Sequence, residues 1–137
     1  MGWPELLANP PANAELRYRT GHRRAEQGET FLVIKGSGQA SLENRRDTET
    51  LRFAWALEAS DVRAAFDALK SAGFPHAPVQ TVPPGSGIIA LEMTGAPDHP
   101  PVLLHRSFLR DLPDWTRAVR RLDDLCVRAS CGAIRPG

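Results

Sequence analysis

Residues 29–74 read ETFLVIKGSGQASLENRRDTETLRFAWALEASDVRAAFDALKSAGF, and this stretch decides the fold. Its first part contains the extended segments Glu29–Lys35, Gln39–Arg45 and Thr50–Glu58. They carry short apolar runs or alternating apolar residues, which are typical of β-strands. The glycines of Gly36-Ser37-Gly38 indicate a tight turn between the first two segments. The stretch therefore predicts neighbouring antiparallel strands ahead of a helix.

The helix predicted after these strands has well-marked ends. Ser60 offers an N-cap hydroxyl, and Asp61 places a negative charge in the first turn. Apolar residues then recur at three- and four-residue spacings up to Ala72, which gives the helix one apolar face. Gly73 suits the left-handed conformation that ends many helices, and Pro75 blocks continuation. We expect a single helix with one buried face.

The strand Thr50–Glu58 has the most regular alternation in the chain. Its large side chains share one face and are Leu51, Phe53, Trp55 and Leu57. Burial of each such side chain stabilises a fold by about 1.5–3 kcal/mol before entropy is counted. A shift of one residue would expose them all, so we expect a firmly held register with these residues in the core.

Further elements are predicted on both sides of this block. They are a half-buried strand at Ala14–Thr20, a hairpin of Gly87–Thr94 and Pro101–Phe108, and a last helix from Asp111 or Asp114 to Ala129. The apolar stripe of the last helix includes Trp115 and Cys126 and predicts that this helix packs on the sheet. The neighbouring carboxylates Asp123 and Asp124 are expected on its exposed side, as solubilising charge.

The chain is therefore predicted to be an α+β domain with the element order β-β-β-β-α-β-β-α. Strands joined by short turns run antiparallel, so about six strands form an antiparallel sheet with two helices packed on one face. We expect a single domain over residues 14–130 and a C-terminal tail over residues 131–137. Residues 1–13 are expected to form an N-terminal arm, because their prolines prevent a continuous helix.

Charge and length exclude several classes of protein. The 137 residues contain 17 Lys and Arg against 16 Asp and Glu, so no strong net field attracts nucleic acid or an anionic membrane. No apolar run approaches the roughly 20 residues that span a bilayer, and no secretory signal is visible. We therefore expect a cytoplasmic protein, and the near-exclusive use of Arg over Lys favours a GC-rich bacterial source.

No residue pattern predicts a catalytic or metal site. Cys126 and Cys131 are too few ligands for structural zinc, and the histidines lack the spacing of metal-binding pairs. Gly36-Ser37-Gly38 lacks the third glycine and the following helix of a dinucleotide-binding loop. Asp98 and His99 form a pair with acid–base character, but they fall in a predicted turn. We expect no enzyme, no metal and no cofactor.

Interaction residues are predicted instead on the sheet face opposite the helices. Arg17, Arg19 and Arg52 alternate with apolar residues of their strands, so they project from that face together with Glu92. Changing Arg52 to Glu is expected to leave the melting temperature nearly unchanged and to weaken a partner complex. The predicted partner-binding residues are Trp3, Arg17, Arg19, Arg23, Arg24, Arg52, Pro83, Pro84, Asp98 and His99.

The N-terminus and the loops contribute the rest of this set. Trp3 belongs to no periodic stripe, so it either anchors a partner or folds back over the sheet edge. Proline stiffens the loops Thr81–Gly87 and Gly95–Pro100, which lowers the ordering cost of binding. The arginine-rich run Arg17–Arg24 has the type of side chain that binds phosphate, although nearby glutamates balance its charge.

The segments that decide the fold also carry a family resemblance. The run Leu32–Ala40, a later strand, and the helix from Ser60 to its Gly73-Phe74 step resemble small bacterial domains of the emfourin type, over roughly residues 14–108. Domains of that type are compact sheet-plus-helix proteins, and the type member inhibits a thermolysin-like metalloprotease. The resemblance implies the architecture and a binding module. It implies no inhibitory residue, because no motif matches at that level.

The leading hypothesis is a non-catalytic bacterial protein–protein interaction module of the inhibitor, immunity-protein or adaptor type. Such a module would occlude a partner, for example a toxin or a protease, with its open sheet face and loops. One alternative is an enzymatic or small-molecule-binding domain with a pocket between sheet and helices, lined by Glu92, His99, His105 or Arg106. A second is RNA binding through Arg17–Arg24, which the balanced charge disfavours. A homodimer stays open as a further arrangement.

Overall fold

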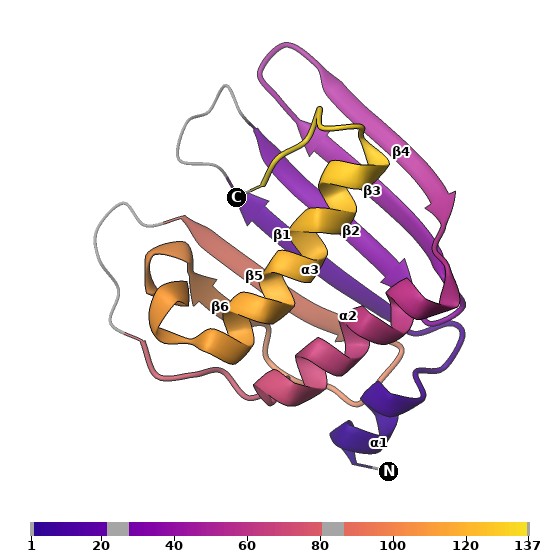
Figure 1. Ribbon diagram of the computed structural model, residues 1–137, viewed down its shortest axis with the longest axis vertical. Coiled ribbons are helices and arrows are strands. Elements are labelled where there is room, and N and C mark those ends of the chain that lie inside the picture. Colours follow the sequence, from indigo (N-terminus) through magenta and orange to yellow (C-terminus); the bar gives the residue numbers. More distant parts are fainter. Residues whose placement is uncertain (1, 22–27, 81–86, 137) are drawn as a thin grey trace.

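A computed structural model describes residues 2–21, 28–80 and 87–136. The fold is α+β, as the sequence predicts, with an antiparallel sheet and helices layered on it (Figure 1). In chain order, the elements are α1 (Trp3–Ala8), β1 (Glu15–Gly21), β2 (Glu29–Lys35), β3 (Gln39–Arg45), β4 (Thr50–Ala56), α2 (Ala59–Ala72), β5 (Ile88–Thr94), β6 (Val102–His105), the 3-10 helix η2 (Arg106–Asp111) and α3 (Pro113–Ala129).

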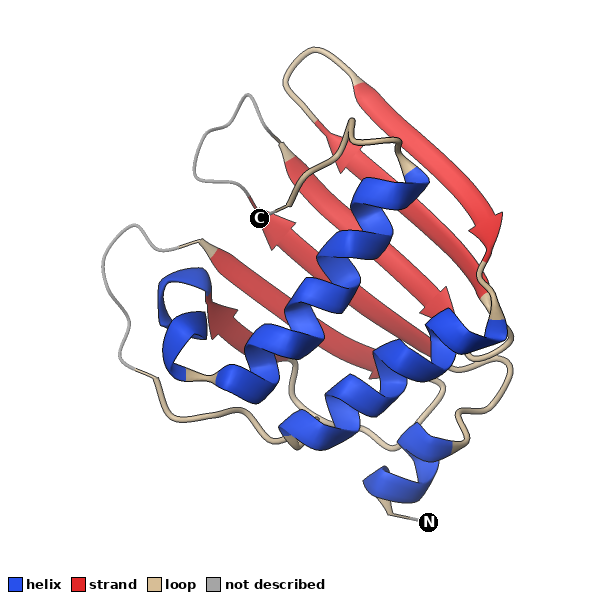
Figure 2. Ribbon diagram, viewed as in Figure 1, coloured by secondary structure: helices blue, strands red, loops and turns tan. Residues whose placement is uncertain are grey.

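The six strands form one antiparallel sheet in the order β4-β3-β2-β1-β5-β6. The first four strands follow one another as a meander, and β5 pairs with the free edge of β1. Figure 2 shows α2 and α3 lying side by side across one face of the sheet. The core lies between these two layers, where Leu16, Leu32 and Leu91 are at most 1% exposed.

The ends of α2 follow the sequence signals with one difference. The helix begins at Ala59 with Glu58 at the N-cap and no capping side-chain hydrogen bond, so Ser60 lies inside the first turn. The C-terminal end is as predicted, because Gly73 is left-handed with φ of 93° and donates its N–H to carbonyls of the last turn. Phe74 then folds back as a buried residue and donates its N–H to Leu69 O.

The apolar face of β4 is less buried than the alternation predicts. Its large side chains pack against the core but remain partly exposed; they are Leu51, Phe53, Trp55 and the following Leu57. The reason is topological. β4 is an edge strand of the sheet, so a neighbour covers its side chains on one flank only. The predicted facing of these residues is confirmed, because they pack against the core, and each stays partly exposed at the sheet edge.

The N-terminal residues contain a helix that the sequence analysis did not predict. Pro4 occupies the first turn of α1, where a missing N–H costs nothing. Leu6 and Leu7 are 5% and 0% exposed, and the helix α1 that carries them packs beside α2 (Figure 1). The chain then passes so close to the turn before β3 that a Cβ on Gly36 would lie 2.1 Å from Pro11 O. Residues 2–14 are therefore packed against the domain.

The second strand of the predicted hairpin is shorter than expected. β6 ends at His105, and the residues up to Asp111 form η2, whereas the sequence predicts a strand up to Phe108.

Beyond α3, the C-terminal segment also packs on the domain. Ile134 is 1% exposed, and its N–H donates to Ser130 Oγ at 2.9 Å.

Candidate protein-binding surface

The sheet face opposite the helices is open among the described residues. Arg17 and Arg19 of β1 and Arg52 of β4 are exposed on this face, and the partly exposed Glu92 of β5 shares it. Cross-strand register places Arg17 opposite Glu92. The structure therefore brings these four side chains onto one surface, which we call the open face.

Ion pairs between neighbouring side chains neutralise much of the charge on the open face. Arg17 pairs with Glu15 at 3.1 Å, and Arg19 pairs with Glu29 at 3.9 Å. Both arginines are more than half exposed, so these pairs contribute little stability. Because Arg17 and Arg19 each already have a carboxylate neighbour, these two residues of the arginine-rich run offer little free positive charge for phosphate.

A second ion-pair cluster lies at the β3–β4 end of the open face. Glu43 accepts a hydrogen bond from Arg45 at 2.9 Å and pairs with Arg52 at 3.6 Å. The hydrogen bond from Arg45 is the largest effect and lowers the pKa of Glu43. Desolvation comes next and opposes it, and the charges of Arg45 and Arg52 lower the pKa further. The Arg45 guanidinium also lies 4.7 Å from the ring centre of Phe31, which covers that partly buried ring.

Two large apolar side chains stand exposed at the other end of the open face. Ile88 of β5 is 50% exposed, and Leu103 of β6 is 48% exposed. Register places Leu103 opposite Ala90, so Ile88 and Leu103 are diagonal neighbours on adjacent strands. We call Ile88, Ala90 and Leu103 the apolar patch. This patch was not predicted, although the sequence contains the signal for it. Its residues fall out of phase with the buried Ile89, Leu91, Val102 and Leu104.

Trp3 and His99 lie together in an aromatic cluster away from the open face. Trp3 packs edge-on against Phe74 and His99, with ring centres 5.7 Å and 5.1 Å apart. Of the two arrangements that the sequence left open for Trp3, the structure shows it folded back onto the domain. Its ring contacts are with Phe74, just after α2, and with His99 in the β5–β6 turn.

The ring of His99 braces the β5–β6 turn through both nitrogens. Nε2 accepts the Met93 N–H at 3.1 Å, so the ring proton resides on Nδ1, which donates to Pro100 O at 2.8 Å. His99 is therefore engaged in holding the turn, and its neighbour Asp98 is exposed. The remaining predicted partner-binding residues, Arg23, Arg24, Pro83 and Pro84, lie outside the described residues.

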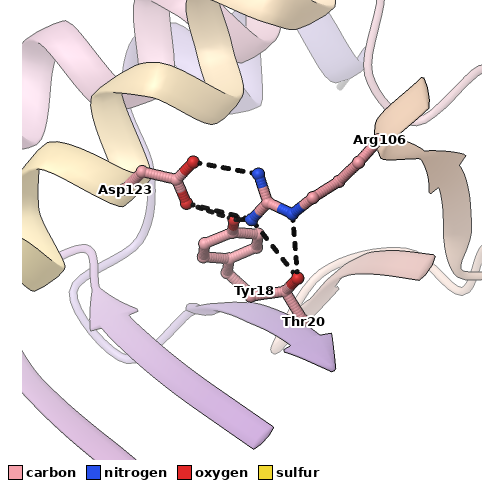
Figure 3. A network of polar contacts seen from close by, with 4 residues as sticks. All are labelled: Tyr18, Thr20, Arg106 and Asp123. Atoms are coloured by element: carbon pink, nitrogen blue, oxygen red, sulfur yellow. Dashed lines mark hydrogen bonds and ion pairs between the residues drawn. The ribbon is translucent and has the colours of Figure 1, made fainter. Parts of the chain in front are cut away.

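A polar network joins the sheet to the helix layer at one end of β1 (Figure 3). Arg106 donates from Nη1 to Asp123 Oδ2 at 3.2 Å and from Nη2 to Tyr18 Oη at 2.8 Å. Tyr18 in turn donates its hydroxyl proton to Asp123 Oδ1. Thr20 Oγ1 accepts from Nε and Nη2 of Arg106 at 3.3 Å. We call these four residues the Arg106 network.

Burial fixes the protonation states around the Arg106 network. Desolvation, and then the charge of Asp123, raise the pKa of Tyr18 well above its usual value, so this tyrosine acts as a neutral hydrogen-bond donor. The same two causes raise the pKa of the nearby Cys126 thiol to about 12. A neutral phenol and a protonated thiol are poor nucleophiles and bases at neutral pH. The network therefore acts structurally, by holding β1, η2 and α3 together through hydrogen bonds and an ion pair.

The residues proposed for a pocket in the alternative hypothesis do not meet. Arg106 points into the layer between sheet and helices, whereas Glu92 lies on the open face and His99 in the aromatic cluster. His105, the last residue of β6, is 8% exposed, and its Nδ1 has no hydrogen-bond partner among the described residues. Among the described residues, these side chains therefore do not converge on one site.

The described residues contain neither a metal-binding cluster nor a membrane-spanning helix. No group of three or more His, Cys, Asp and Glu side chains is placed to hold a metal ion. Within the same residues, no helix has the length and apolar character needed to cross a membrane.

The fold and the open face define a small α+β domain with a one-sided antiparallel sheet. No protein-family model and no curated protein sequence matches the chain, so the comparisons assign it to no family. The resemblance to emfourin-type domains therefore stays a prediction from the sequence.

Proposed function

We propose that this chain is a non-catalytic protein-binding module that binds its partner with the open face. The observation that carries the proposal is the apolar patch, because Ile88 and Leu103 are large side chains left about half exposed on a surface that no described element covers. Exposed apolar groups rimmed by charge are typical of protein-binding surfaces. Arg19 and Glu92 supply such a rim, since register places Arg19 directly opposite Ala90, and Glu92 lies two residues after Ala90 on the same face of β5.

The rigidity of the sheet supports the same function. The open face is formed by six paired strands. On the helix side, the Arg106 network holds β1 to η2 and α3, and the hydrogen bonds of His99 hold the β5–β6 turn. A surface that is ordered before binding loses little conformational entropy on association. Inhibitors, immunity proteins and adaptors act in this way, by covering a partner's surface. The emfourin-type resemblance favours the inhibitor role, with a bacterial toxin or protease as the partner and a cytoplasmic location.

The test is affinity capture from a lysate of the source organism, with proteins identified by mass spectrometry. The bait is compared with Leu103→Glu and Ile88→Glu, which place charge in the apolar patch. Val79→Glu is the matched control, because Val79 is fully exposed in a loop. We expect all three substitutions to change stability by no more than about 0.5 kcal/mol. The patch variants should lose the partner, and the control should retain it.

Two results would contradict the proposal. The first is a wild-type bait that captures nothing beyond what the bare resin retains. The second is a specific partner that binds the Leu103→Glu variant as well as it binds the wild type, because that partner would use a surface other than the open face.

A further inference from the structure

The two edges of the sheet are β4 and β6, and they are protected very differently. At β6, the side-chain amide of Gln80 occupies the edge. Its Nε2 donates to Leu103 O and its Oε1 accepts from His105 N, both at 2.9 Å. These are the contacts that a neighbouring strand would otherwise make, so Gln80 closes this edge to pairing.

The β4 edge has no such cover among the described residues. Leu57 N donates to Gly38 O on the β3 side, and backbone groups alternate in direction along an antiparallel strand. The N–H and C=O groups of Arg52, Ala54 and Ala56 therefore point away from β3. No hydrogen bond from another described residue reaches them, because β4 pairs with β3 alone.

The sequence of β4 also lacks the devices that block edge pairing. Over Thr50–Ala56 there is no proline, the register with β3 runs without a bulge, and Arg52 is the sole charged residue. Strands of this kind pair readily with another strand.

The helix-side face of β4 has apolar surface to cover as well. Leu51, Phe53 and Trp55 are each partly exposed. Beside Trp55, a hollow of about 310 Å³ is also lined by Leu125 and Ala129 of α3. A strand added at the β4 edge would supply both the missing hydrogen bonds and the missing side-chain neighbours for this stripe.

β4 is self-complementary in one antiparallel register, which points to a second copy of this chain as the added strand. Pairing about a two-fold axis at Phe53 places Leu51 opposite Trp55 of the second copy and Arg52 opposite Ala54 of that copy. Each apolar side chain then meets an apolar side chain on the helix side, and the one charge meets a small neutral residue. No like charges oppose each other along the strand, and a two-fold interface is the commonest symmetry of soluble oligomers.

We propose that the chain forms a homodimer through antiparallel β4–β4 pairing, which joins two six-stranded sheets into one continuous sheet. This inference goes beyond the protein-binding function and does not depend on it, because the apolar patch lies at the opposite end of the sheet. The dimer would present two apolar patches, one at each end of a single platform.

The test measures molar mass by light scattering across a roughly hundredfold range of protein concentration. Ala54 is exposed and faces Arg52 of the second copy in the proposed register. Ala54→Lys therefore sets like charges against each other on both sides of the two-fold axis, and Ala54→Glu sets opposite charges there. We expect the wild type to dimerise, the lysine variant to weaken the dimer at least about tenfold, and the glutamate variant to dimerise at least as tightly as the wild type.

Ala56→Lys is the matched control, because the same register places Ala56 opposite the uncharged Thr50 of the second copy. It should change the dimer dissociation constant far less than Ala54→Lys does. Thermal unfolding of each variant checks that the fold is intact. A wild type that stays monomeric at the highest concentration overturns the proposal. The β4 edge would then be available for pairing with a strand from another protein instead. Equal dimerisation of the lysine and glutamate variants overturns the proposal too.

Discussion

Arg106 and Asp123 form an ion pair whose side chains are 22% and 16% exposed, and Tyr18 shares its hydrogen bonds with both. Charges that are largely withdrawn from water depend on each other, because removal of one partner leaves the other without compensation. The Arg106 network therefore makes the attachment of α3 to β1 sensitive to single polar substitutions. This sensitivity resides in individual side chains rather than in the apolar packing around them.

We expect Asp123→Asn to lower the free energy of unfolding by about 2 kcal/mol, because it leaves the Arg106 guanidinium partly buried without a counter-charge. Asp124→Asn is the matched control, since Asp124 is the next residue of α3 and is exposed. It should change stability by no more than about 0.5 kcal/mol. Urea denaturation followed by circular dichroism measures both. Equal losses for the two variants would show that the Arg106 network does not stabilise the domain.

The role of Asp123 was not predicted from the sequence, and the reason is a matter of helical phase. The sequence pattern predicts Asp123 and Asp124 on the exposed side of the last helix. That prediction is wrong for Asp123. It lies four residues after Val119 and three before Cys126, which are buried, so it borders the apolar stripe. A carboxylate at such a position needs a cation, but Arg106 is distant in sequence and only the fold brings it near.

At the scale of elements, the sequence determined most of the sheet and the two long helices. Alternation set the facing of β4, and Gly73 set the end of α2, because these signals are local. Three features were missed: the helix α1, the 3-10 helix η2 and the partial exposure of β4. The first two are short and carry prolines or mixed patterns that propensity does not resolve. The third depends on which strand lies at the sheet edge, which is a long-range property.

The helix α1 supports a prediction about the N-terminal segment. Leu7 is fully buried beside α2, so Leu7→Ala should lower the free energy of unfolding by about 2–5 kcal/mol through lost contacts and a residual cavity. Val79→Ala, at a fully exposed site, should leave it unchanged within about 0.5 kcal/mol. Both are measured by denaturant unfolding. A neutral Leu7→Ala would mean that residues 2–14 behave as a detachable arm after all.

At the scale of the whole molecule, the protonated groups between sheet and α3 link folding to pH. The pKa of the Cys126 thiol rises from its usual 9.0 to about 12, first through desolvation and then through the charge of Asp123. Burial likewise raises the pKa of Tyr18. Above pH 9 the unfolded chain releases these protons more readily than the folded chain, so the unfolded state binds fewer protons. The stability from both groups is fully present below their unfolded pKa values and is lost as pH rises.

The Cys126 contribution predicts that the free energy of unfolding falls by about 1.4 kcal/mol per pH unit between roughly pH 9 and pH 12, with Tyr18 adding to the slope above its usual value of 10.0. Denaturant unfolding at steps from about pH 8 to about pH 11 measures this slope. Cys126→Ala should flatten it by close to one proton, whereas Cys131→Ala should leave it unchanged because that thiol is exposed. If Cys126→Ala and Cys131→Ala show the same pH slope of the free energy of unfolding, the prediction is wrong. Cys126 would then ionise as freely in the folded chain as in the unfolded chain, which means that water reaches it between α3 and the sheet.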